Sequence, residues 1–328
     1  MSEALEATGM FTVEEFDPIA AIFSHADIWH WHWPDGQFAG GLPATFAKYL
    51  WLRFLLAVAC VRRIPIVWTA HNVDAHESRH PRLEESFRRL FLRRVSGFHF
   101  LSDYSRQLLV ERYPDLIKGI SIVTVHPDYS SIASPVSRQQ ARERLGIDHD
   151  GPIVGFVGTV SRYKGVTRLV EVYTSQSVSP SLFQLLIAGK PNADLKDWVD
   201  SIRNTPGIII VDRQLSQEDL SAAYCASDVI ALPYENITNS GSAVMAMTLG
   251  IPLLVPDRPP MRELAGKAPG GTVNFLDDPL TLEGLLSGLR TGSTWRSRND
   301  GALPGFSWSE IAPALQELYL RVLDRDKF

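Results

Sequence analysis

The chain has 328 residues, enough for roughly two domains of about 150 residues each. Its 45% hydrophobic and 21% charged residues are typical of a globular protein, and its net charge of −5 argues against a general nucleic-acid binder. Two isolated cysteines, Cys60 and Cys225, exclude a disulfide framework and favour buried thiols in a reducing, cytoplasmic compartment. The polar N-terminus does not resemble a secretory signal, and no run of about 18 uncharged apolar residues predicts a transmembrane helix.

Two series of short apolar strands alternating with helices follow one another along the chain. The first has strands at residues 27–33, 64–72, 97–102 and 121–127 and helices at 42–61, 83–95 and 103–112. The second has strands at 152–160, 183–190, 207–212, 227–233 and 251–256 and helices at 166–174, 195–201, 216–225 and 240–249. Continuous apolar strands between helices indicate parallel sheets covered on both faces.

This repetition predicts an α/β protein of two Rossmann-like, doubly wound domains that face a cleft. We place the N-terminal domain at residues 1–135 and the C-terminal domain at 136–305. Residues 306–328 have apolar positions at helical spacing and predict a final helix that crosses back to the first domain. Ligands of such sheets bind beyond the carboxyl ends of the strands, so we expect the site in the cleft.

A turn of small residues, Asn239-Ser240-Gly241-Ser242, stands between a predicted strand and a predicted helix. If it caps the helix, several backbone N–H groups point at one spot, and the positive end of the helix dipole reinforces them. Gly241 lets a ligand approach the backbone closely, and a diphosphate would suit the spot. The alternative is that Ser240 is an ordinary N-cap without a ligand.

A basic loop follows the first strand of the second series. The strand ends at Gly158, and Arg162 and Lys164 precede a helix that begins after Gly165. Cations here could neutralise a phosphate leaving group, whereas the alternative is that they are solvated loop charges. The G-x-x-x-x-G-K-[ST] spacing of a P-loop is absent. Together with the Ser-Gly-Ser turn, the loop favours a phosphate site.

Most of residues 153–275 resemble the nucleotide-sugar domain of GT-B glycosyltransferases. The resemblance is to the large retaining family of cell-wall and polysaccharide enzymes, and to bacterial exopolysaccharide mannosyltransferases of the xanthan type. The family's strand–G-R-L-x-x-x-K-G–helix segment is matched by Gly158, Thr159, Val160, Lys164 and Gly165. Its small-residue helix followed by G-x-P-V is matched at 240–253, and its late x-x-E-L at 262–264.

The chain departs from the family pattern at several positions. The arginine that follows the strand in the family is Thr159 here, and Arg162 is a candidate replacement. The second of two family glutamates falls at Met245, and Glu235 lies slightly before the first. Residues 11–17 look like the family's second strand, so we expect the first strand and its Gly-rich loop to be missing from the N-terminal domain.

Histidines gather at the predicted strand ends of the first domain. His30 and His32 are two residues apart and share one face of a strand, and His71 and Asn72 directly follow the next strand. Each histidine could instead be a packed structural residue. The resemblance implies that His71 contacts the sugar, and we place His30, His32 and Asn72 on the acceptor side.

The loop after these residues supplies candidates for the base that deprotonates an acceptor hydroxyl. They are Glu77, His76 and Asp74, and the sequence does not rank them. No metal site is predicted, because neither cysteines nor a tight carboxylate arrangement accompany the histidines.

Two predicted helices, at 47–63 and 87–95, mix arginine with Leu, Phe and Trp. The ordinary interpretation is a core-packing helix with solvated arginines. The alternative is that one basic face contacts an anionic membrane, as would suit a lipid-linked acceptor.

We therefore expect a metal-independent hexosyltransferase that moves a sugar from a GDP- or UDP-sugar to a glycan or lipid-linked acceptor in polysaccharide or cell-envelope glycan synthesis. The donor is the substrate, and no separate cofactor is expected. The alternatives are a catalytically degenerate GT-B protein that acts as a binding partner, and a nucleotide-sugar epimerase on the same fold. The expected donor-binding residues are Gly158, Thr159, Arg162, Lys164, Glu235, Asn239, Ser240, Gly241 and Ser242.

Overall fold

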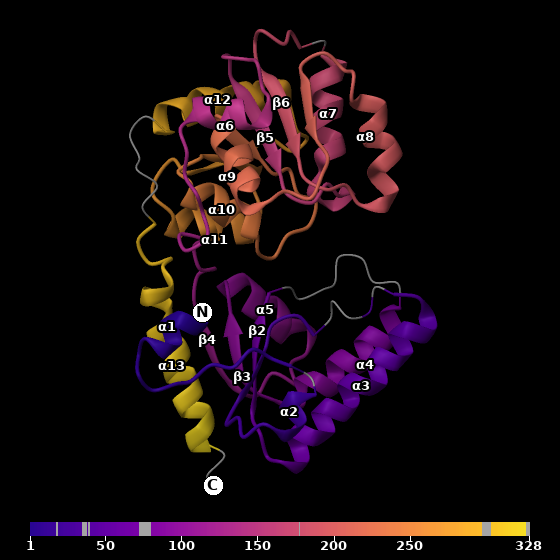
Figure 1. Ribbon diagram of the computed structural model, residues 1–328, viewed down its shortest axis with the longest axis vertical. Helices are drawn as coiled ribbons and strands as arrows, with labels where there is room; N and C mark the ends of the chain where they lie inside the picture. Colours follow the sequence, from indigo (N-terminus) through magenta and orange to yellow (C-terminus); the bar gives the residue numbers. More distant parts are fainter. Residues whose placement is uncertain are drawn as a thin grey trace. The chain divides into compact units, whose positions relative to one another are not determined.

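The computed structural model describes residues 1–17, 19–34, 38, 40–71, 80–176, 178–296 and 303–325. The chain forms two compact units, Met1–His126 with Trp308–Phe328, and Pro127–Ser307, both drawn in Figure 1. The division after His126 lies before the predicted boundary at 135, and the first unit takes in the C-terminal helix.

The first unit is built on four parallel strands in the order β1-β2-β3-β4, with helices on both faces. Successive residues of a strand point to opposite faces. Val67 therefore packs against α13, while Trp68 joins the core beneath α3 and α4. The strands are β1 Trp29–Trp31, β2 Ile66–Ala70, β3 Val95–Phe100 and β4 Ile120–Val123. The helices are α1 Ser2–Glu6, α2 Ala20–Phe23, α3 Leu42–Val61, α4 Pro81–Leu92, α5 Asp103–Arg112 and α13 Trp308–Arg325.

Two expectations for this unit are wrong. Residues 11–17 form no strand. Three of these seven residues are acidic, so the segment cannot fill a buried strand, and Phe16 instead packs its ring 6.0 Å from Trp29 at the edge of the sheet. Cys60 is exposed rather than buried, because it lies on the outer face of α3, whereas Cys225 is buried as expected.

The second unit contains six parallel strands in the order β10-β9-β8-β5-β6-β7. Their bounds are β5 Ile153–Val157, β6 Gln184–Ala188, β7 Ile208–Val211, β8 Val229–Ala231, β9 Leu253–Pro256 and β10 Val273–Leu276. β10 was not predicted, because most of its four residues are half-buried or exposed and it lacks the apolar run of the other strands. The chain adds β6 and β7 on one side of β5 and then β8, β9 and β10 on the other.

Helices flank this sheet, and a buried ion pair ties one of them to the strands. Arg142 of α6 donates to Asp228 at 3.1 Å, and the same carboxylate oxygen accepts the N–H of Ile153 at 2.8 Å. This contact fixes α6 to the beginnings of β5 and β8. The helices are α6 Arg138–Leu145, α7 Val166–Ser175, α8 Lys196–Ile202, α9 Gln217–Ala226, α10 Gly241–Thr248, α11 Pro259–Lys267 and α12 Leu282–Arg296, with 3-10 turns η2 Arg162–Lys164 and η3 Ala193–Leu195.

Candidate active site

The carboxyl ends of β5 and β8 form the topological switch point of the second unit. These neighbouring strands are followed by connections that run to opposite sides of the sheet. Open α/β sheets bind their ligands in the crevice at such a point. The basic loop follows β5 and the small-residue turn follows β8, so the strand order brings the two predicted features together.

Glycine shapes the loop after β5 at two positions. Gly158 has a φ of +121° and donates its N–H to the carbonyl of Ala188 at 2.9 Å. Gly165 has a φ of +74°, and a Cβ added to it would lie 1.9 Å from the carbonyl oxygen of Pro233. L side chains rarely adopt such backbone angles, so both positions favour glycine. The close approach at Gly165 sets the basic loop directly against the β8–α10 connection.

Two hydrogen bonds reinforce this contact. Arg168 of α7 donates to the carbonyl of Pro233 at 2.6 Å. Glu235 donates its N–H to the carbonyl of Tyr163 at 3.0 Å. The loop that carries Lys164 and the connection that leads to α10 are therefore held together at three points.

The head of α10 offers unused backbone donors. Ser240 is the N-cap, and its Oγ accepts the N–H of Ala243 at 3.0 Å. The N–H groups of Gly241 and Ser242, in the first turn, donate no hydrogen bond to any residue that the structure describes. Such groups, with the positive end of the helix dipole, attract anions.

Lys164 and Ser242 meet at Gly158. A Cβ added to Gly158 would lie 3.1 Å from Oγ of Ser242 and 3.4 Å from Nζ of Lys164. The amine and the hydroxyl therefore flank one point of the backbone at the switch point. A cation, a hydroxyl and the head of a helix thus converge there.

Burial lowers the pKa of Lys164 from 10.5 to about 8. Desolvation disfavours the charged amine, and among the described residues no carboxylate pairs with it. A bound anion would supply the missing countercharge and favour the protonated form. The site is therefore electrostatically suited to an anionic ligand.

Two buried tyrosines that were not predicted from the sequence contact the serines at the start of α10. The hydroxyl of Tyr234 lies 2.7 Å from Oγ of Ser240, and burial raises the pKa of Tyr234 to about 12. Burial also raises the pKa of Tyr224 beyond its ordinary range, although a hydrogen bond with Ser242 opposes this. Both phenols therefore stay neutral near pH 7 and hold the two serines without adding negative charge to an anion site.

Most of the other predicted donor residues are solvent-exposed. Arg162 donates to Asp194 of η3 at 3.1 Å in a solvent-exposed ion pair. The side chains of Thr159 and Glu235 are exposed, and Asn239 is half-buried. The contact at Gly158 therefore involves Lys164 and Ser242, in the first turn of α10.

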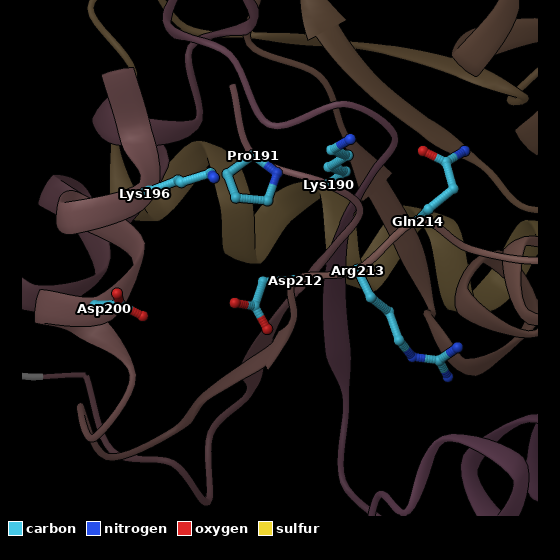
Figure 2. Close-up of a pocket in the computed structure, with 7 residues that line it drawn as sticks. All are labelled: Lys190, Pro191, Lys196, Asp200, Asp212, Arg213 and Gln214. Carbon is cyan, nitrogen blue, oxygen red and sulfur yellow. The ribbon is translucent and has the colours of Figure 1, made fainter. Parts of the chain in front are cut away.

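A hollow with a cavity volume of about 380 Å³ lies at the carboxyl ends of β6 and β7, as Figure 2 shows. Pro191 forms a β-bridge with Val160, so the hollow adjoins the loop after β5. Asp200 and Asp212 on its wall both pair with Arg203. Its lining residues are Lys190, Pro191, Lys196, Asp200, Asp212, Arg213 and Gln214.

In the first unit, a ladder of hydrogen bonds crosses the sheet near the carboxyl ends of its strands. It joins side chains of α13, β1, β2, β3 and the residue after β4 over successive distances of 2.5, 2.7, 2.9 and 2.8 Å. In order, its members are Tyr319, His30, Thr69, His99 and Thr124.

One backbone carbonyl fixes the direction of the whole ladder. Thr124 donates its only hydroxyl proton to the carbonyl of Val125 at 2.9 Å, so it accepts from Nε2–H of His99. Nδ1 of His99 then accepts from Thr69, which in turn accepts from Nε2–H of His30. Both ring nitrogens of His30 are thus engaged, which favours the structural interpretation of this histidine.

His32 and His71 form a separate pair capped by an exposed tryptophan. Nδ1 of His32 lies 3.0 Å from Nε2 of His71. Trp33 stacks on His71 with ring centroids 4.2 Å apart, and it is 63% exposed. Trp33 was not among the predicted site residues, because only the fold places it beside His71, at the end of β2. An exposed aromatic face beside hydrogen-bonding imidazoles suits a sugar ring, which has apolar faces and a hydroxylated rim.

His32, His71 and His99 are uncharged near neutral pH. Burial lowers the pKa of His32 to about 4 and those of His71 and His99 to about 3. Neighbouring imidazoles lower the pKa values of His71 and His99 further. Neutral imidazoles can hydrogen-bond to hydroxyls but give no cation to a phosphate, so the two units present different chemistry.

Four predicted residues, Asn72, Asp74, His76 and Glu77, lie outside the described residues, and their roles stay predictions. Within the described residues, no group of three His, Cys, Asp or Glu side chains is placed to hold a metal ion.

Comparison with known proteins agrees with this architecture. Residues 137–274 match the family model described as Glycosyl transferases group 1. The chain is 26% identical over 281 residues to a 2-deoxystreptamine glucosyltransferase of Streptomyces kanamyceticus, covering 80% of the chain and 70% of that protein. It is 24% identical over 315 residues to a GDP-mannose:glycolipid 4-beta-D-mannosyltransferase of Xanthomonas campestris pv. campestris, covering 93% and 83%.

Solved structures give the same fold. HepE of Anabaena, solved in complex with UDP and glucose, has a TM-score of 0.62 at 17% identity, over 82% of the chain and 75% of that structure. The two parallel-sheet α/β units and this similarity define the GT-B fold. Residues 137–274 form a glycosyl transferases group 1 segment on this fold, and the chain resembles the xanthan-type mannosyltransferases. These comparisons give no support to the binding-partner or epimerase alternatives.

Proposed function

We propose that the chain transfers a sugar from a GDP- or UDP-sugar to a glycan or lipid-linked acceptor in polysaccharide or cell-envelope glycan synthesis. The convergence of Lys164 and the head of α10 at the switch point carries the proposal. The mannosyltransferase relative, named for GDP-mannose and a glycolipid, supports a nucleotide-sugar donor and a lipid-linked acceptor. The exposed thiol of Cys60 and the buried thiol of Cys225 are consistent with a reducing, cytoplasmic location.

In the proposed reaction, the bond between the anomeric carbon and the diphosphate oxygen breaks. A bond from the acceptor oxygen to that carbon forms. The leaving nucleoside diphosphate carries the bonding electrons away, and Lys164 with the N–H groups of Gly241 and Ser242 would stabilise its charge. A cation and a helix head would thus take the role that a metal ion plays in other enzymes, so we propose metal-independent transfer. The proton of the acceptor hydroxyl goes to a base, for which residues 74, 76 and 77 remain the candidates.

The remaining parts of the substrates have candidate positions as well. The hollow of Figure 2 adjoins the basic loop and is where we place the nucleoside. We place a sugar of the acceptor against Trp33, where this ring stacks on His71, because an exposed aromatic face lies there beside neutral imidazoles.

The test uses the purified chain with UDP, GDP, ADP and dTDP in thermal-shift measurements, followed by hydrolysis assays with the matching nucleotide sugar. We expect one nucleotide to raise the melting temperature and its sugar derivative to be hydrolysed slowly in the absence of acceptor. Lys164→Ala should lose most of the shift, whereas Lys267→Ala, on α11, should retain it. No shift with any nucleotide would favour a non-catalytic partner, and isomerised sugar without acceptor would favour an epimerase.

A further inference from the structure

Helix α3 presents a continuous apolar face to solvent. Phe46, Leu50 and Phe54 are spaced four residues apart, share one side of the helix and are 48%, 50% and 46% exposed. Trp51 and Val61 extend the same face, and Val61 is 84% exposed. A helix of a globular unit ordinarily turns charged side chains to water, and contiguous exposed apolar surface of this kind marks an interaction site.

The opposite face of α3 is part of the core of the first unit. Leu52, Leu55 and Leu56 pack in the cluster that also contains Trp68 and Phe91. By length and composition α3 could cross a membrane. Spanning would require these leucines to leave the core, however, so the helix is placed to lie along a surface rather than to cross it.

The charges of α3 and the two residues after it have a single sign. Residues 42–63 contain four basic side chains and no acidic one. Lys48 and Arg53 are exposed beside the apolar stripe, and Arg62 and Arg63 follow its end. A helix with an apolar face, cationic borders and an aromatic residue such as Trp51 matches the surface of an anionic bilayer. A protein partner would need to bring its own acidic rim.

We propose that α3 docks the first unit on an anionic lipid bilayer, with Phe46, Leu50 and Phe54 immersed and Lys48 and Arg53 at the headgroups. α3 and the adjacent α4 can be followed in Figure 1. The inference rests on α3 and not on the transferase site, although a lipid-linked acceptor would be met on the same surface.

The test is co-sedimentation of the full chain with sucrose-loaded vesicles of phosphatidylcholine alone, or with 30% phosphatidylglycerol as a roughly physiological anionic content. We expect binding to the anionic vesicles and much weaker binding to the neutral ones. The triple variant Phe46→Gln, Leu50→Gln, Phe54→Gln should bind the anionic vesicles about a hundredfold more weakly, at about fivefold per half-exposed side chain. Lys48→Gln should weaken binding to the anionic vesicles about fivefold, and raised salt should weaken the binding of the wild-type chain in the same way.

The matched control is Leu182→Gln with Phe275→Gln, two similarly exposed apolar residues of the second unit, which should leave vesicle binding unchanged. Circular dichroism and the nucleotide-induced thermal shift report whether each variant is folded. Absence of wild-type binding to both vesicles, or equal loss in the control variant, overturns the proposal. A dimer that the triple variant dissociates, without vesicle binding, would instead assign the face to a second copy of the chain. The co-sedimentation experiment contains no sugar donor or acceptor, so an absence of vesicle binding would leave the proposed transferase function intact.

Discussion

The charge state of Lys164 gives the sharpest test of the phosphate site. With a pKa of about 8, the amine of the free protein is about nine-tenths protonated at pH 7 and about one-tenth protonated at pH 9. Only the protonated amine attracts a diphosphate. The terminal phosphate, with a pKa near 6, is largely ionised throughout this range. The dissociation constant of the bound nucleoside diphosphate should therefore rise about tenfold from pH 7 to pH 9, whereas an ordinary lysine with a pKa near 10.5 would leave it nearly constant.

Two substitutions of this lysine separate its charge from its shape. Lys164→Ala removes a charge-assisted contact worth about 2 kcal/mol, so binding at pH 7 should weaken roughly thirtyfold and lose its pH dependence. Lys164→Arg keeps a cation that does not titrate below pH 9, so binding should persist with a flat pH profile.

The assay is isothermal titration calorimetry at pH 7, 8 and 9, with the nucleoside diphosphate that gives the largest thermal shift. Lys267→Ala is the control, since that side chain pairs with Glu263 on α11 and should keep the wild-type profile. An equal tenfold change in Lys164→Ala, or a flat wild-type profile, would refute the assignment of the titrating group to Lys164.

Three further outcomes follow from the geometry. Gly165→Ala places a Cβ 1.9 Å from a backbone oxygen and should lower the free energy of unfolding, measured in urea, by about 2–3 kcal/mol. The control Gly146→Ala has a similar φ but open space around the added Cβ, so it should lower that free energy by only about 1 kcal/mol. Equal losses in the two variants would contradict the packing argument. The pKa of His99 is about 3 in the folded chain and near 6.5 in the unfolded chain, so between these two pH values the unfolded chain binds more protons. The free energy of unfolding therefore falls as the pH drops below 6.5. His99→Gln should reduce that slope by about 1.4 kcal/mol per pH unit between pH 4.5 and 6, and an unchanged slope would exclude His99 as its source. Trp33→Ala should raise the acceptor KM about tenfold while sparing nucleotide affinity, because the ring stacks on His71 in the other unit from Lys164; an unchanged KM would remove Trp33 from the acceptor site.

Local patterns in the sequence were enough to predict the class of fold and most of its elements. The predicted bounds of α3 and α5 coincide with those observed, and local signals mark where both helices begin: Pro43 lies in the first turn of α3, and the side chain of Ser102 caps α5. The five strands predicted for the second unit are all present, since buried parallel strands are unbroken apolar runs between helices. The basic loop and the Ser-Gly-Ser turn were also visible, because glycine and serine mark turns and helix ends locally.

The convergence of these segments was decided only by the tertiary structure. β8 lies beside β5 through contacts between residues about 75 positions apart, such as the hydrogen bond that the N–H of Ile153 donates to the carboxylate of Asp228, and no local pattern encodes that neighbour. The neutral ladder through His30 and His99 likewise depends on four strands and a C-terminal helix meeting in register. The exposed side of α3 could not be chosen from sequence either, because apolar residues surround that helix and only packing decides which of them meet water.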